Sequence, residues 1–264
     1  MKSILILGSR GFIGKNLVEF IKNKKNIKLN YDRKKTDLTN YNNWKNFEKT
    51  EFLILLSSIS NEIKFKKNIA KSYDNNLNII LNAIKFCLEN NSKLIFISSA
   101  SSKVIKSNYG ISKLISELIC KQFFKNFGLQ YTILRIFNVY GPNQSKIYLI
   151  PSLIDKFKKN NKKIIVHNLD SLRDYIYIDD VCNAIYKSIF LKSKNLTLDI
   201  GTGKSYSVLF IINSISKILN KKVIINNLKT TKKTISKANL NKTFKYLKWK
   251  PKLSIIKGLN LIIK

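Results

Sequence analysis

Tyr109 and Lys113 are the two residues of this chain whose types and spacing best fit proton transfer. The segment Tyr109-Gly110-Ile111-Ser112-Lys113 opens a stretch with helical periodicity, so both side chains share one helix face. A free tyrosine titrates near pH ~10 and is a poor base at neutral pH, but a neighbouring ammonium stabilises the phenolate. The spacing predicts Tyr109 as an acid/base activated by Lys113, against the plainer interpretation of a surface helix pair.

Two serines come shortly before this pair. Ser98 and Ser99 end the apolar run Leu94–Ser98, which reads as a buried strand. Ligands of open α/β sheets bind at the carboxyl ends of the strands. We therefore expect Ser99 to hold a substrate oxygen while Tyr109 moves its proton.

A glycine-rich turn lies near the start of the chain. Gly8-Ser9-Arg10-Gly11-Phe12-Ile13-Gly14 follows the apolar run Ser3–Leu7 and opens an amphipathic stretch. In this strand-turn-helix context Gly8 allows a tight turn, Gly11 admits a diphosphate to the backbone, and Gly14 lets the helix pack on the strand. The turn predicts a dinucleotide site at a helix N-terminus.

Asp32 follows the second apolar run, Ile27–Tyr31. A carboxylate there can accept hydrogen bonds from the adenosine ribose, which favours NAD. Arg33, Lys34 and Arg10 lie near it in the sequence and can instead hold a 2′-phosphate, which favours NADP, so the preference for NAD is slight. A solvated turn acid is the other interpretation of Asp32, and Asp37-Leu38 is expected to border the adenine.

Strand and helix patterns alternate along the first half of the chain and become irregular after Pro142. We expect an α/β protein with a Rossmann-type doubly wound parallel sheet and a small C-terminal α/β substrate lobe. The predicted division is 1–145 for the dinucleotide-binding domain, with a later strand returning to it, and 146–264 mainly for the lobe. The expected strands are Ser3–Leu7, Ile27–Tyr31, Phe52–Leu56, Leu94–Ser98, Tyr131–Ile136, Ile164–Val166, Tyr175–Ile178, Leu196–Ile200 and Lys222–Ile225, and the expected helices are Gly14–Lys22, Tyr41–Phe47, Asn75–Glu89, Tyr109–Phe127, Tyr148–Lys158, Asp179–Leu191, Val208–Leu219 and Ala238–Leu247.

The charge of the chain invites a nucleic-acid interpretation. The net charge is +34, but the lysines are scattered along all 264 residues, as an AT-rich codon bias would produce. We therefore expect no nucleic-acid partner. No apolar run is long enough to span a membrane, and the N-terminal run is too short for a signal peptide. Three cysteines in apolar settings, Cys87, Cys120 and Cys182, favour reduced core residues of a cytoplasmic protein.

These features resemble the extended short-chain dehydrogenase/reductase family, the NAD-dependent epimerases, dehydratases and reductases of nucleotide sugars. The resemblance runs almost end to end. Further matching segments are Phe52–Ser58, Asn76, Leu134–Pro142, Arg173–Val181, Asp199–Gly203, Tyr206–Val208 and Trp249–Pro251.

The resemblance implies a role for each matching residue. Ser99, Tyr109 and Lys113 would be the catalytic residues, and Asn138 and Arg173 would approach the diphosphate of a nucleotide sugar. For Arg173 an ion pair with Asp174 or Asp179 is the structural alternative. Nothing in the sequence resembles a metal site, and His167 is expected in the lobe. The implied cofactor-binding residues are Gly8, Arg10, Gly11, Phe12, Ile13, Gly14, Asp32, Arg33, Asp37, Leu38, Leu56, Ser57, Ser58, Asn76, Tyr109 and Lys113.

The implied activity is hydride transfer at a sugar carbon, C4 by preference, in the synthesis of surface-polysaccharide precursors. A 4-epimerase is slightly favoured over a 4-keto-sugar reductase. Ala100-Ser101 after Ser99 disfavours dehydration, and the lack of a nearby cysteine disfavours 3,5-epimerisation. The remaining alternatives are a cofactor-binding sensor without turnover, suggested by the short loop before Tyr109, and a nucleic-acid-binding protein. Relatives often dimerise through two helices, so a homodimer is an expectation.

Overall fold

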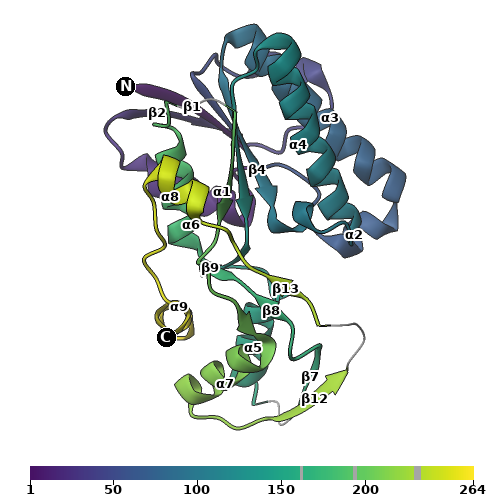
Figure 1. Ribbon diagram of the computed structural model, residues 1–264, viewed down its shortest axis with the longest axis vertical. Coiled ribbons are helices and arrows are strands. Elements are labelled where there is room, and N and C mark those ends of the chain that lie inside the picture. The colour runs from purple at the N-terminus through teal and green to yellow at the C-terminus, as the bar shows by residue number, and fades with distance from the viewer. Residues whose placement is uncertain (161–162, 193–194, 229–232) are drawn as a thin grey trace.

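The central sheet of the protein is parallel and six-stranded (Figure 1). The computed structural model describes residues 1–160, 163–192, 195–228 and 233–264. All strand pairs of this sheet are parallel. In spatial order its strands are β10 (Leu196–Ile200), β5 (Tyr131–Ile136), β4 (Lys93–Ser99), β3 (Phe52–Leu55), β1 (Lys2–Leu7) and β2 (Ile27–Tyr31).

Helices cover both faces of this sheet, because alternate strand residues enter two separate cores. Ile4, Ile6 and Ile54 pack with α1 (Phe12–Lys22) and α6 (Ile178–Ser188). Leu5, Leu53 and Phe96 pack with α3 (Ile69–Asn90) and α4 (Asn108–Phe127). The arrangement confirms the predicted Rossmann-type α/β fold.

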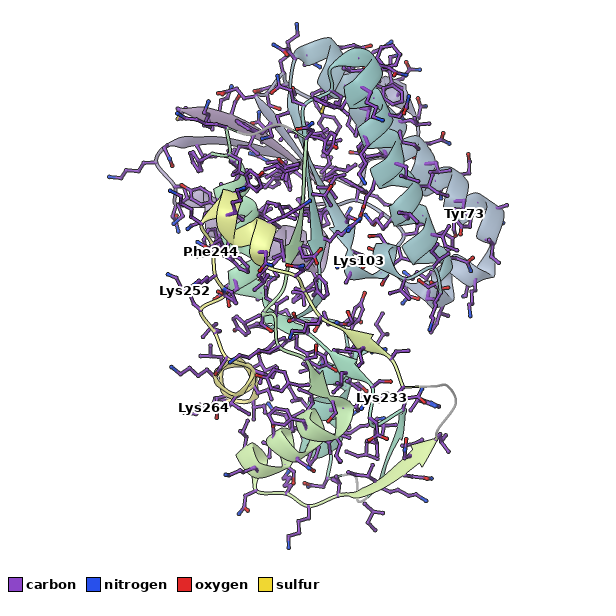
Figure 2. All side chains as sticks on the ribbon, in the orientation of Figure 1. Tyr73, Lys103, Lys233, Phe244, Lys252 and Lys264 are labelled. Atoms are coloured by element: carbon purple, nitrogen blue, oxygen red, sulfur yellow. The ribbon has the colours of Figure 1, made fainter. Side chains whose placement is uncertain are left out.

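The second half of the chain forms the lower part of the molecule in Figures 1 and 2, and it also returns to the sheet. β10 pairs with β5, and α8 (Asn241–Leu247) packs against β10. The division at residue 145 stays a prediction. The other elements of this half are β6 (Asn138–Tyr140), α5 (Leu149–Lys158), β7 (Lys163–His167), β8 (Leu172–Arg173), β9 (Tyr175–Tyr177), β11 (Tyr206–Ser207), α7 (Val208–Leu219), β12 (Ile224–Leu228), β13 (Ile235–Ser236) and α9 (Ile255–Ile263).

Several elements differ from the expected ones. The segment expected as a helix over Tyr41–Phe47 is a 3₁₀ helix, η1 (Tyr41–Asn46). α3 begins six residues before the expected Asn75, because Asn68 caps it by accepting a hydrogen bond from the Lys71 amide. Elements that the sequence analysis missed are α2 (Glu62–Lys67), η2 (Ala100–Lys103), α9 and the two- or three-residue strands β6, β8, β11 and β13.

The residues that the structure describes include no helix long and apolar enough to cross a membrane. They also contain no group of three or more histidine, cysteine or acidic side chains that could hold a metal ion. The three cysteines are free and buried, as expected.

Candidate active site

The carboxyl end of β4 and the start of α4 bring the predicted catalytic residues to one edge of the sheet. β4 ends at Ser99, and α4 begins at Asn108. The Ser107 hydroxyl caps the helix by accepting a hydrogen bond from the Gly110 amide at 3.0 Å. The Glu62 carboxylate of α2 accepts the amides of Asn108 and Tyr109, each at 3.3 Å. Two capping groups therefore fix the first turn of the helix that carries Tyr109 and Lys113.

Lys113 is buried beside Tyr109. Its Nζ donates to the Ile97 carbonyl at 2.8 Å and lies 5.8 Å from the centre of the Tyr109 ring. Burial lowers the pKa of Lys113 to about 7, although the negative charge of Glu117 opposes this shift. The amine can therefore gain or lose its proton near neutral pH.

Tyr109 contacts two serine hydroxyls at the same edge. Burial raises the pKa of Tyr109 to about 12, the nearby Tyr148 adds to this, and hydrogen bonds with Ser58 and Ser99 oppose it. Tyr148 comes from the second half of the chain, where it immediately precedes α5. With this pKa the phenol keeps its proton at neutral pH, so Tyr109 can act first as an acid or be activated by a further positive charge.

Behind these groups lies a buried ion pair between Glu117 of α4 and Arg135 of β5. Arg135 Nη2 and Glu117 Oε2 are 2.5 Å apart, and Glu117 is fully buried. Ser98 and Ser102 donate to Glu117 Oε1 at 2.5 and 2.8 Å. Burial would raise the pKa of Glu117, but the hydrogen bonds from Arg135, Ser98 and Ser102 outweigh burial and lower it. The carboxylate thus holds the chain on both sides of Ser99.

In the glycine turn, protein atoms fill the space beside Gly14, whereas the space over Gly11 is open. A Cβ on Gly14 would lie 2.2 Å from the Gly8 carbonyl oxygen, so only glycine fits there. A Cβ on Gly11 would meet only that oxygen, at an ordinary 3.4 Å. No side chain caps α1, whose N-terminal amides are left available for an anion. The open space over Gly11 and the uncapped helix fit the diphosphate of a dinucleotide.

Asp32 contacts the backbone of this turn. Its carboxylate accepts the amides of Gly8 at 3.1 Å and Ser9 at 2.8 Å. The carboxylate is therefore part of the turn rather than a solvated acid. Arg10 and Arg33 are exposed, and the Arg33 guanidinium lies 5.4 Å from the centre of the Tyr31 ring.

The other predicted cofactor residues surround the turn and the Tyr-Lys pair. Leu56 and Ser57 donate their amides to the Leu7 carbonyl, and Phe12 and Ile13 pack against the core. Buried Asn76 donates to the Ser112 hydroxyl at 3.2 Å and accepts the Ile59 amide.

The segment expected to border the adenine is more closed. Leu38 is buried, and its carbonyl accepts the Trp44 indole N–H. Asp37 accepts the Thr39 amide and hydroxyl. The contact with adenine stays a prediction for both residues.

Asn138 lies on β6, which pairs with β9, and Arg173 lies on β8, which precedes β9 in the chain. Asn138 donates its amide and side chain to the Asp174 carbonyl. The Arg173 guanidinium donates to the carbonyl and hydroxyl of Thr234, at 3.0 and 2.7 Å. Within the described residues Arg173 forms no ion pair with Asp174 or Asp179. Their approach to a substrate diphosphate stays a prediction.

Sequence reasoning missed three acidic residues that organise this edge. Glu117 is one turn beyond Lys113, so the spacing of four residues would have indicated it. Asp174 accepts the Thr202, Gly203 and Ala238 amides, which explains the glycines around Thr202. Glu62 lies on α2, a helix too short to show a clear period.

An open parallel sheet, a glycine turn and a Tyr-Lys pair with a buried lysine at the carboxyl edge are the features of a short-chain dehydrogenase/reductase-type, dinucleotide-binding protein. Residues 4–201 match the profile of the NAD dependent epimerase/dehydratase family. The chain belongs to this family.

Individual relatives agree with this assignment. The chain is 32% identical over 237 residues to a GDP-6-deoxy-D-talose 4-dehydrogenase from Aggregatibacter actinomycetemcomitans, covering 81% of this chain and 79% of that protein. The fold is similar to that of RMD from Pseudomonas aeruginosa complexed with NADPH, with a TM-score of 0.91, 19% identity and coverage of 100% and 98%. It is also similar to UDP-glucose 4-epimerase from Thermotoga maritima, with a TM-score of 0.88, 21% identity and coverage of 99% and 97%.

Proposed function

We propose that the protein catalyses NAD(P)-dependent hydride transfer at C4 of a nucleotide-diphosphate sugar, with Tyr109 as the acid/base. The observation that carries this proposal is the buried Lys113 amine beside the Tyr109 ring, at the strand end that presents Ser99. The name of the 4-dehydrogenase relative supports both the substrate class and the carbon.

The three catalytic residues have separate tasks. Ser99 and Tyr109 hydrogen-bond to the same sugar oxygen, and Tyr109 exchanges the proton on it. Lys113 in its charged form stabilises the phenolate of Tyr109 once that proton has left. When bound, the nicotinamide cofactor accepts or supplies the hydride at the adjacent carbon.

The glycine turn and Asp32 are the residues proposed to hold this cofactor. The N-terminal amides of α1 and the open space over Gly11 receive the diphosphate. Asp32 keeps an oxygen free to accept a ribose hydroxyl, since Oδ2 has one amide partner, Gly8, among the described residues. We propose NAD as the cofactor, with NADP as the alternative because Arg10 and Arg33 are exposed nearby.

The substrate diphosphate is proposed to lie against Arg173 and Asn138. Two hydrogen bonds with Thr234 orient the Arg173 guanidinium, and no acid among the described residues neutralises it. A planar donor set of this kind suits bidentate recognition of phosphate oxygens.

Two forms of this reaction use Tyr109 differently. In a 4-epimerase, the form that the sequence slightly favours, Tyr109 acts first as a base and then as an acid on the same oxygen. In a 4-ketoreductase or 4-dehydrogenase, the form that the relative's name favours, Tyr109 acts once. The epimerase consumes no added cofactor, whereas the reductase or dehydrogenase oxidises or reduces one cofactor molecule for each sugar molecule.

The test is turnover of a panel of UDP-, GDP- and dTDP-sugars and their 4-keto forms, with and without added NAD(P)H. The Tyr109→Phe variant is expected to lose about 10²- to 10⁴-fold in kcat while still binding cofactor, because only the proton-transfer group is removed. Tyr186→Phe is the matched control, since that exposed hydroxyl contacts Asn26 outside the catalytic edge. Equal activity in wild type and Tyr109→Phe would overturn the mechanism.

The remaining expectations concern partners and location. Cofactor binding without turnover of any sugar would favour the sensor, and loss of cofactor binding together with tight nucleic-acid binding would favour the nucleic-acid alternative. A homodimer, the absence of a nucleic-acid partner and a cytoplasmic location stay predictions.

A further inference from the structure

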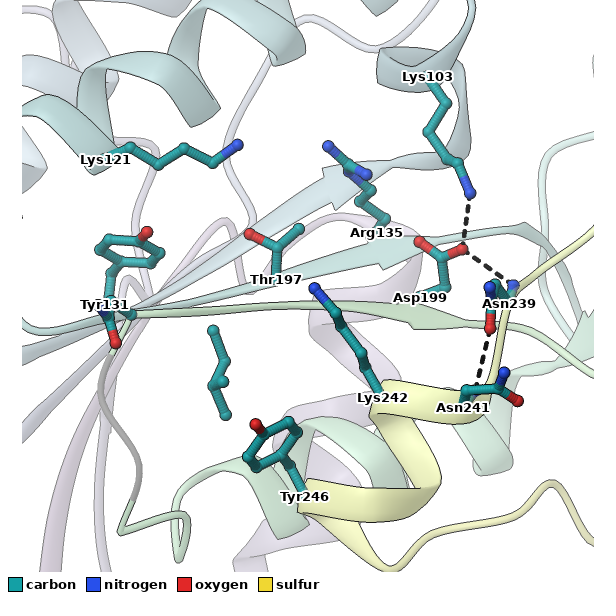
Figure 3. Close-up of a pocket in the computed structure, with 12 residues that line it drawn as sticks. Lys103, Lys121, Tyr131, Arg135, Thr197, Asp199, Asn239, Asn241, Lys242 and Tyr246 are labelled. Atoms are coloured by element: carbon teal, nitrogen blue, oxygen red, sulfur yellow. Dashed lines mark hydrogen bonds and ion pairs between the residues drawn. The ribbon is translucent and has the colours of Figure 1, made fainter.

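A second pocket lies beside α4, outside the candidate active site. Its volume is about 650 Å³, within the range of about 300–1,000 Å³ that is typical of small-molecule sites. Figure 3 shows it opening over β5 and β10, with α8 on its lower side. None of Ser99, Tyr109 and Lys113 lines it. The lining residues are Lys103, Lys121, Tyr131, Arg135, Asn195, Leu196, Thr197, Asp199, Asn239, Asn241, Lys242 and Tyr246.

The pocket exists because the helices on this side of the sheet stop short of its edge. Thr197 and Asp199 of β10 pair in register with Ile133 and Arg135 of β5, so these side chains share one face. α4 covers this face over β4 and β5. α8 packs against β10 from the other direction, and the space between α4 and α8 remains open.

Four cationic side chains from four different elements converge on this space. Lys103 is paired with Asp199 at 2.9 Å, and Arg135 is paired with Glu117. Lys121 of α4 and Lys242 of α8 have no acidic partner among the described residues. In Figure 3 the charged ends of Lys121 and Arg135 point toward each other above the strands, and the amine of Lys242 points toward the same strands from α8 below. Asp199 is the one acid that lines the pocket within the described chain, so the lining carries a clear excess of positive charge.

Aromatic and amide groups stand beside these charges. Tyr246 is exposed at the side of the pocket opposite Lys121, and Tyr131 lies at its end. The side chains of Asn239 and Asn241 add neutral hydrogen-bonding groups. Converging unpaired lysines repel one another unless an anion lies between them.

We propose that this pocket binds a small anion that carries two or more phosphate groups and is no larger than a nucleotide. Lys121 and Lys242 would bind its phosphate oxygens from opposite sides, and Tyr246 offers a ring face to a planar group. A concave site of this volume suits a small molecule better than a nucleic-acid strand, which needs a continuous groove. The proposal does not depend on the activity proposed above.

The experiment is calorimetric titration of the full protein with inorganic pyrophosphate, and separately with ADP, after saturation with NAD. Lys121→Glu and Lys242→Glu reverse one charge each in the pocket. Their matched controls are Lys125→Glu on α4 and Lys257→Glu on α9, each of which reverses an exposed charge outside the lining. The thermal midpoint of each variant reports whether it is folded, and Lys242 is exposed, so at least that variant is expected to fold.

We expect each pocket variant to weaken pyrophosphate binding by about tenfold or more, as the loss of a charge-assisted hydrogen bond implies. The control variants should change the affinity by less than about twofold, apart from the general charge effect that all four variants share. Equal weakening in all four variants, or no binding to the wild type, would overturn the proposal. ADP binding tighter than pyrophosphate would identify a nucleotide, and variant effects seen only with a single-stranded oligonucleotide would replace the small molecule with a nucleic acid.

Discussion

Lys113 and Lys121 lie two turns apart on α4, but the region around Lys113 is closed and the region around Lys121 is open. Lys113 is buried at the carboxyl edge of the sheet, where protein groups surround it on every side. Lys121 is half-buried and reaches into the open pocket over β5 and β10. The same residue type therefore gives a buried amine with a pKa near neutrality in one region and an amine that reaches an open pocket in the other.

Glu117 separates these two regions. It lies between the two lysines on α4. Its fully buried carboxylate binds Arg135, which lines the open pocket, and Ser98, which precedes Ser99, the residue proposed to be catalytic. Buried partners stabilise the candidate active-site edge, whereas the pocket contains cations without acidic partners. A site that moves a proton needs buried partners around its titrating group, and a site that binds a charged ligand needs charges that the protein itself does not neutralise.

Of the substitutions considered, Glu117→Gln is expected to lower the free energy of unfolding the most. The substitution keeps the shape but leaves Arg135 without its buried counter-charge, which costs about 3 kcal/mol in the free energy of unfolding. Urea unfolding of the two proteins measures this loss. The rearranged backbone around Ser99 should also reduce kcat, with cofactor affinity retained.

Glu19→Gln is the matched control for that substitution. Glu19 pairs with Lys22 on the exposed side of α1, where solvent screens the charges, so no resolvable change in unfolding is expected. Equal stability of Glu117→Gln and wild type would show that the buried pair does not hold the catalytic edge, and the comparison between the two regions would fail.

Much of the fold could be predicted from the sequence because its signals are local. Parallel strands such as Ile27–Tyr31 and Tyr131–Ile136 are short runs rich in apolar residues, and both have the predicted bounds. The two- and three-residue strands, such as β8 and β13, depend on partners far away in the chain. Their own residues carry no period, so no local pattern indicates them.

The candidate site divides in the same way. The Tyr109–Lys113 spacing and the glycine turn indicate their positions because the geometry of one turn or one helix fixes them. The contact of Glu62 with the start of α4 joins residues more than 40 positions apart, as does the bond of Arg173 with Thr234. Such partners are set by how the elements pack, and only the structure supplies them.

The glycine turn also contains a closed position, Gly14, and an open position, Gly11, and substitutions at the two are expected to have different, smaller effects on stability. Gly14→Ala should destabilise the protein by about 1–3 kcal/mol, because its Cβ would meet the Gly8 carbonyl at 2.2 Å. Gly11→Ala should cost less than about 1 kcal/mol in stability but weaken cofactor binding about tenfold, since its Cβ would enter the open space proposed for the diphosphate. Urea unfolding and NAD(P)H fluorescence titration measure the two effects, and the reverse pattern would place the diphosphate elsewhere.

Lys113→Met is expected to change the free energy of unfolding by an amount that depends on pH. The pKa of Lys113 is about 7 in the folded protein and near ~10.4 in an unfolded chain, so between these values the unfolded state binds more protons. The contribution of Lys113 to the free energy of unfolding therefore rises with pH across this window, by about 1 kcal/mol per pH unit.

Urea unfolding of wild type and Lys113→Met at pH 7.5, 8.5 and 9.5 isolates this contribution, because all other titrating groups are common to both proteins. The stability of the wild type relative to the variant should increase at each step. If the difference in the free energy of unfolding between wild type and Lys113→Met were the same at all three pH values, the Lys113 amine would be hydrated. The candidate active-site edge would then not be closed to water.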